Sequence, residues 1–74
     1  MKSLTVSCAT YRGATSYRIL ERSHMSDGNQ LERWRRGDDG VLKYLIEMYG
    51  ISPEAAYVVA LEAKTSGSAE ITIP

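Results

Sequence analysis

The hydrophobic pattern of this 74-residue chain changes from strand-like to helix-like at residues 37–40. Before that segment, apolar and polar residues alternate in short runs, which is the period of β-strands. After it, as far as about residue 64, apolar residues recur every three or four positions, which is the period of α-helices. Because the length suits one domain, residues 1–74 are expected to form a single compact unit with strands and helices in separate layers.

Two strands are predicted before the change of period, at residues 3–12 and 16–23, with a turn at residues 13–15 between them. Each strand has one apolar face and one polar face. The residues on the apolar faces, which are expected to be buried, are Leu4, Val6, Cys8, Tyr17 and Ile19.

A third strand is predicted at residues 30–36, after an Asp-Gly-Asn turn signal at residues 27–29. A short helical turn also fits these seven residues. A last short strand is predicted at residues 69–73, where Ile71 and Ile73 alternate with polar positions.

A first helix is predicted at residues 39–49, with a wide apolar stripe. Asp38 or Asp39 is expected to cap its start, because aspartate oxygens accept hydrogen bonds from free N–H groups at a helix N-terminus. Gly50 is expected to end the helix in the left-handed conformation.

A second helix is predicted from Pro53 to about Lys64, with Ser52 as its cap and Gly67 beyond its end. Small residues form one continuous side of this helix, and that side is expected to pack closely on the sheet. The residues on it are Ala55, Ala56, Val59, Ala60 and Ala63.

The resulting element order, β-β-β-α-α-β, predicts an α+β fold. One antiparallel sheet of about four strands must bury one face, and the two helices are the only elements available to cover it. A two-layer sandwich is therefore expected.

Few residues could support catalysis or metal binding. Cys8 and His24 are the only cysteine and the only histidine, so the chain can form neither an internal disulfide nor a tetrahedral zinc site. A Cys8–His24 dyad can be drawn, but a buried thiol and a loop histidine are the better interpretation. A helix cap explains Asp38 and Asp39 better than a weak cation site does. No catalytic residue, metal or cofactor is predicted, and an enzyme is not expected.

The hydropathy pattern predicts a soluble protein. No apolar run reaches the roughly 18–20 residues that a membrane span needs. The start of the chain has no apolar core of a signal peptide, because Ser3, Thr5 and Ser7 interrupt it. A cytoplasmic protein that does not enter a membrane is expected.

Charge is unevenly distributed, although the net charge is zero. Residues 1–36 carry seven basic and three acidic side chains, whereas residues 37–74 carry two basic and six acidic ones. Six of the seven basic residues are arginines, which form planar, bidentate contacts with phosphates and carboxylates. The two halves could bind partners or could simply neutralise each other within the fold.

The first candidate surface is the outer face of the sheet. If Trp34 faces the helices with the other apolar residues, the neighbouring arginines point outward, and a one-residue change of register would exchange the two faces. Arginines and aromatics suit nucleic acid or an acidic protein surface, although sheet faces also carry arginine for solubility alone. The residues predicted to bind on this face are Tyr11, Arg18, Arg22, Arg33 and Arg35.

The second candidate surface is the outer side of the second helix. An apolar cluster framed by charges is typical of an interface, unless the first helix covers it. This helix is not expected to read DNA bases, because its first turn lacks arginine, asparagine and glutamine. The residues predicted for a protein contact or a homodimer here are Glu54, Tyr57, Val58, Leu61 and Glu62.

In size, composition and element order the chain resembles small phage and mobile-element inhibitors, the anti-CRISPR proteins in particular. That resemblance implies a non-enzymatic protein that blocks a nucleoprotein effector complex in the cytoplasm of a host cell by surface contact. The contacts would come from the arginines or, less favourably, from Glu54, Glu62, Asp38 and Asp39 imitating nucleic acid. The alternatives are a small nucleic-acid-binding accessory protein and an oligomeric assembly subunit.

Overall fold

The computed structural model describes residues 2–23 and 30–73 and has the predicted element order. Four antiparallel strands and two helices form an α+β fold, so residues 30–36 are a strand and not a helical turn. His24 and the turn predicted at residues 27–29 lie outside the described residues. The elements are β1 (Lys2–Tyr11), β2 (Ala14–Ser23), β3 (Gln30–Arg36), α1 (Gly37–Tyr49), α2 (Pro53–Ser66) and β4 (Ser68–Ile73).

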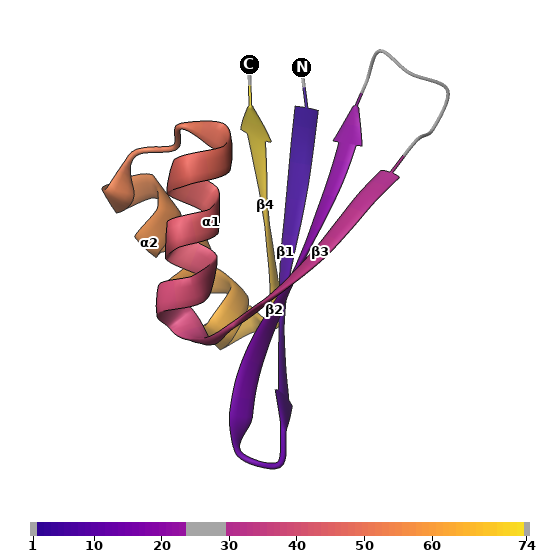
Figure 1. The fold of residues 1–74 in the computed structure, drawn as a ribbon, viewed down its shortest axis with the longest axis vertical. Coiled ribbons are helices and arrows are strands. Elements are labelled where there is room, and N and C mark those ends of the chain that lie inside the picture. The colour runs from indigo at the N-terminus through magenta and orange to yellow at the C-terminus, as the bar shows by residue number, and fades with distance from the viewer. Residues whose placement is uncertain (1, 24–29, 74) are drawn as a thin grey trace.

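The sheet has the order β3-β2-β1-β4, with the long β1–β2 hairpin in the centre and the shorter strands at the edges. Both helices lie on one side of the sheet (Figure 1). We call the covered side the helix face and the other side the open face. Neither of the two described helices is both long enough and apolar enough to cross a membrane.

The β1–β2 turn consists of Arg12 and Gly13, one residue earlier than predicted. Both residues have positive φ angles, 53° and 78°, as the two central residues of a type I′ turn do. The hairpin extends beyond its neighbours, because β4 pairs with β1 only as far as Ser7 and β3 pairs with β2 only as far as Ser16. Its tip therefore projects away from the helices as a two-stranded ribbon (Figure 1).

The core lies between the helix face and the two helices. The alternation predicted for the first two strands is confirmed, because Leu4, Val6, Tyr17 and Ile19 are fully buried and Cys8 packs against them at the margin. Small side chains on α2 allow close packing on the sheet. The remaining buried core residues are Val41, Tyr44, Leu45, Ala56, Val59, Ala60, Ala63 and Ala69.

The ends of the helices follow local signals with one exception. Gly50 is left-handed at φ 66°, and the Ser52 hydroxyl accepts a hydrogen bond from the Ala55 N–H, as predicted. The predicted aspartate cap of α1 is wrong. The helix begins at Gly37, and the side chain of its N-cap residue, Arg36, makes no capping hydrogen bond.

Asp38 and Asp39 instead lie within the first turn of α1, where a carboxylate still interacts favourably with the helix dipole. The Asp38 carboxylate is taken up by tertiary contacts, because it accepts a hydrogen bond from the Tyr17 hydroxyl. A cap prediction from sequence could not anticipate this contact with β2.

Candidate interaction surfaces

The open face of the sheet exposes the only tryptophan of the chain. Trp34 lies directly across from Arg18 of β2, and 51% of its surface is exposed. The prediction that Trp34 packs in the core is therefore wrong. The registers of β1 with β2 and of β2 with β3 place Arg18, Arg22 and Trp34 on the face opposite Tyr17 and Ile19.

The prediction that Arg33 and Arg35 share this face with Arg18 and Arg22 is wrong. They lie across from Ile19 and Tyr17, on the helix face. Charged side chains are tolerated there because β3 is an edge strand that the helices cover only in part. Arg35 lies over the Tyr44 ring, with its guanidinium carbon 4.4 Å from the ring centre, beside a cleft of about 340 Å³ between β3 and α1.

Tyr11 lies at the far end of the open face, on the projecting ribbon, and 72% of its surface is exposed. The guanidinium of Arg12 lies 5.3 Å from the centre of its ring. Arg12 is the only described non-glycine residue with a positive φ angle. An aromatic side chain and an arginine are thus held together at the tip of the hairpin.

The open face carries little net charge. Arg18 is paired with Glu32, with Nε 2.6 Å from Oε1, although the N–H is not aligned for a hydrogen bond. Arg22 and Arg36 have no ion-pair partner within residues 2–23 and 30–73, and Glu70 lies on the same face in β4. Positive charge therefore exceeds negative charge only slightly on this face.

The outer side of α2 is also exposed. Tyr57, Val58 and Leu61 expose 58%, 58% and 47% of their surfaces, so α1 does not cover the predicted apolar cluster. Glu54 and Glu62, the charged residues predicted to frame it, are exposed as well.

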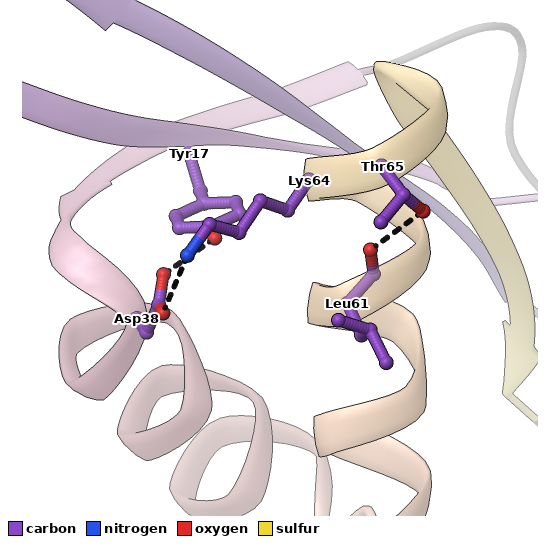
Figure 2. Close-up of polar contacts among 5 residues, drawn as sticks. All are labelled: Tyr17, Asp38, Leu61, Lys64 and Thr65. Atoms are coloured by element: carbon purple, nitrogen blue, oxygen red, sulfur yellow. Dashed lines mark hydrogen bonds and ion pairs between the residues drawn. The ribbon is translucent and has the colours of Figure 1, made fainter.

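A groove of about 110 Å³ separates this cluster from α1. Its walls are apolar, and its polar end is formed by Tyr17, Asp38 and Lys64 (Figure 2). The Tyr17 hydroxyl donates to Asp38 Oδ1 over 2.6 Å, and Lys64 Nζ lies 3.4 Å from Asp38 Oδ2. The apolar lining comes from Leu42, Tyr57, Ala60 and Leu61.

The polar end of the groove shifts two pKa values in opposite directions. Burial, and then the hydrogen bond to Asp38, raises the pKa of Tyr17. The hydrogen bond from Tyr17, and then the charge of Lys64, lowers the pKa of Asp38. The contact therefore favours a neutral phenol that donates to an ionised carboxylate, and it ties β2 to both helices.

Within the described parts of the chain, no three histidine, cysteine, aspartate or glutamate side chains are grouped to hold a metal ion. Comparison with protein-family models, with curated proteins and with solved structures finds no match to this chain.

Sequence reasoning missed three features of these surfaces. It placed Trp34 inside, it left Arg36 out of the open face, and it gave Arg12 no role. The signal for Arg12 was present, because a Tyr-Arg-Gly sequence between two alternating runs allows a two-residue turn with arginine in its first position. The signal for Trp34 was ambiguous, because either register of QLERWRR leaves charged residues on both faces.

Proposed function

We propose that this chain is a non-enzymatic binding protein that inhibits a nucleoprotein effector complex by surface contact, as anti-CRISPR proteins do, in the cytoplasm of a host cell. The observation that supports it is the exposed indole of Trp34 beside Arg18, on the sheet face that neither described helix covers. Tryptophan, tyrosine and arginine are the residues that contribute most at protein interfaces.

The contact surface runs from Trp34 along the open face to Tyr11 and Arg12 at the tip of the hairpin. The left-handed conformation of Arg12 supports including the tip, because backbone strain is often retained where a side chain serves binding. A projecting ribbon can also enter a recess that a flat sheet cannot.

The charge of this face favours a protein partner over free nucleic acid. Phosphate backbones are bound by several unpaired lysines and arginines acting together. Here Arg18 is already paired with Glu32. The negative charge of Glu70 on the same face offsets part of the positive charge of Arg22 and Arg36. A nearly neutral face that exposes a large aromatic side chain suits the surface of a protein subunit better.

The test is a panel of purified CRISPR effector complexes with guide RNA bound, assayed for target binding and cleavage with and without this protein. Inhibition by the wild type that Trp34→Ala abolishes is the expected result. Leu31→Ala is the matched control, because Leu31 is on the same strand, is exposed, and lies on the opposite face. Since Trp34 is the only tryptophan, its emission should also shift when the complex forms.

The competing function is separated by anisotropy of labelled single- and double-stranded DNA and RNA at low and near-physiological salt. Tight binding that weakens steeply with salt and is lost in Arg18→Ala/Arg36→Ala would replace the proposal with a nucleic-acid-binding accessory protein. An absence of inhibition across the panel would overturn the anti-CRISPR assignment.

A further inference from the structure

The exposed side of α2 carries a self-complementary stripe. Four residues spaced three, four and three positions apart lie along one side of the helix, away from the buried alanines. In order they are acidic, aromatic, aliphatic and basic: Glu54, Tyr57, Leu61 and Lys64.

When a second copy of the helix runs in the opposite direction, the acidic residue lies opposite the basic one and the aromatic residue lies opposite the aliphatic one. If two copies of α2 pack antiparallel with their centres aligned at residue 59, Glu54 of one copy lies beside Lys64 of the other. Tyr57 then lies beside Leu61 of the second copy. Each contact occurs twice, as a two-fold axis requires.

The groove beside the stripe provides room for such packing. Its volume of about 110 Å³ suits a single side chain, and Tyr57 and Leu61 form part of its walls. Figure 2 shows Lys64 reaching from α2 toward Asp38 of α1, so that its ammonium group lies at the polar end of the groove. With three N–H donors and a side chain that is 54% exposed, Lys64 can contact Asp38 and a second carboxylate together.

We propose that two copies of this chain associate through antiparallel α2 helices. The apolar centre is formed by Tyr57 and Leu61 of both copies, and two Glu54–Lys64 pairs close its ends. The antiparallel arrangement also brings the acidic start of each helix to the basic end of the other, which favours this orientation over the parallel one. A seam of about ten residues, or about 15 Å, predicts a weak dimer that is sensitive to concentration.

The dimer leaves the proposed binding surface free. Helix α2 belongs to the layer opposite the open face, so both sheets face outward (Figure 1). The pair would present two copies of Trp34 and two hairpin tips to its partners, and linked sites gain apparent affinity when both engage. This association does not depend on the proposed inhibitory function.

Sedimentation velocity from about 1 µM to about 1 mM tests the association, because weak self-association falls in this range. The average mass should rise from 8.2 kDa toward twice that value. Leu61→Glu should hold it at the monomer value at every concentration, while circular dichroism shows the same fold. A wild-type protein that stays monomeric to the highest concentration would overturn the proposal.

Charge reversal tests the geometry. Glu54→Lys and Lys64→Glu should each raise the dimer dissociation constant by roughly tenfold, because each creates two like-charge pairs. The double variant Glu54→Lys/Lys64→Glu should restore the wild-type value to within a few-fold. Glu70→Lys, the same change on the open face, is the control and should have no effect.

Thermal unfolding of the variants at low concentration separates loss of association from loss of folding, which matters because Lys64 also contacts Asp38. Failure of the double reversal to restore association, with all variants folded, would refute the antiparallel α2 contact. A dimer lost in Trp34→Ala but kept in Leu61→Glu would refute it equally and would place the interface on the sheet.

Discussion

The turn of the β1–β2 hairpin offers a substitution whose sign can be worked out from opposing contributions. Arg12 occupies the left-handed region at φ 53°, where a side chain with a Cβ costs about 1–2 kcal/mol. Asparagine tolerates this conformation better and is favoured before glycine in type I′ turns. Arg12→Asn should therefore recover about 1 kcal/mol of the strain.

The same change removes the contact between the Arg12 guanidinium and the Tyr11 ring, 5.3 Å apart. At an exposed site such a contact contributes about 0.5–1 kcal/mol. The net gain for Arg12→Asn is then about 0.5 kcal/mol or less. In a Tyr11→Ser background the contact is already absent, so the gain should rise to about 1 kcal/mol.

Urea unfolding followed by circular dichroism measures these differences as shifts of the midpoint, which 0.5 kcal/mol moves by about 0.2–0.5 M. Hydrogen exchange of the ribbon amides at residues 9–15 reports the same gain locally, because this tip can open without global unfolding. Gly13→Ala is the control of opposite sign, since Gly13 has φ 78°. If Arg12→Asn gains nothing even without the Tyr11 ring, then relief of left-handed strain is the wrong explanation for Arg12.

Three further outcomes are expected. Tyr17→Phe removes the hydroxyl that donates to Asp38 and should lower the free energy of unfolding by about 1–2 kcal/mol, with a smaller loss when Asp38→Asn is already present. Burial raises the pKa of Tyr17 and Tyr49, so folding stabilises both phenols in the protonated form. Their contribution to the free energy of unfolding is complete below about pH 10 and is lost as the pH rises further. Circular dichroism and phenolate absorbance can follow this loss together. Gly50→Ala forces a Cβ into the left-handed end of α1, at φ 66°, and should lower the thermal midpoint by an amount equivalent to about 1 kcal/mol.

Features that depend on neighbouring residues in the sequence could be predicted. The end of α1 at Gly50 and the start of α2 at Ser52 and Pro53 follow from backbone preferences and one side-chain hydrogen bond. The alternation in β1 and β2 and the small-residue side of α2 identified the core for the same reason. Each of these signals is local and is reinforced by the burial of an apolar face.

The start of α1 and the face of β3 could not be predicted, because distant contacts decide both. Asp38 is engaged by Tyr17, twenty-one positions away, and so is not available to cap its helix. The register of β3 depends on its pairing with β2, and its sequence holds one aliphatic and one aromatic residue on opposite faces. At an edge strand neither face is fully buried, so hydrophobicity alone does not select the register.

The position of Arg33 and Arg35 on the edge strand also bears on how this sheet can meet a partner. Their guanidinium groups donate to the backbone carbonyls of Glu32 and Trp34, at 2.9 Å and 2.7 Å. Charged side chains folded onto an edge strand oppose pairing with a strand from another molecule. Contact through the β3 edge is therefore disfavoured, while the indole of Trp34 on the same strand remains accessible from the open face. Arg33 and Arg35, which the sequence suggests as binding residues, thus oppose strand pairing at the edge of the sheet. The neighbouring Trp34 is the better candidate for the contact itself.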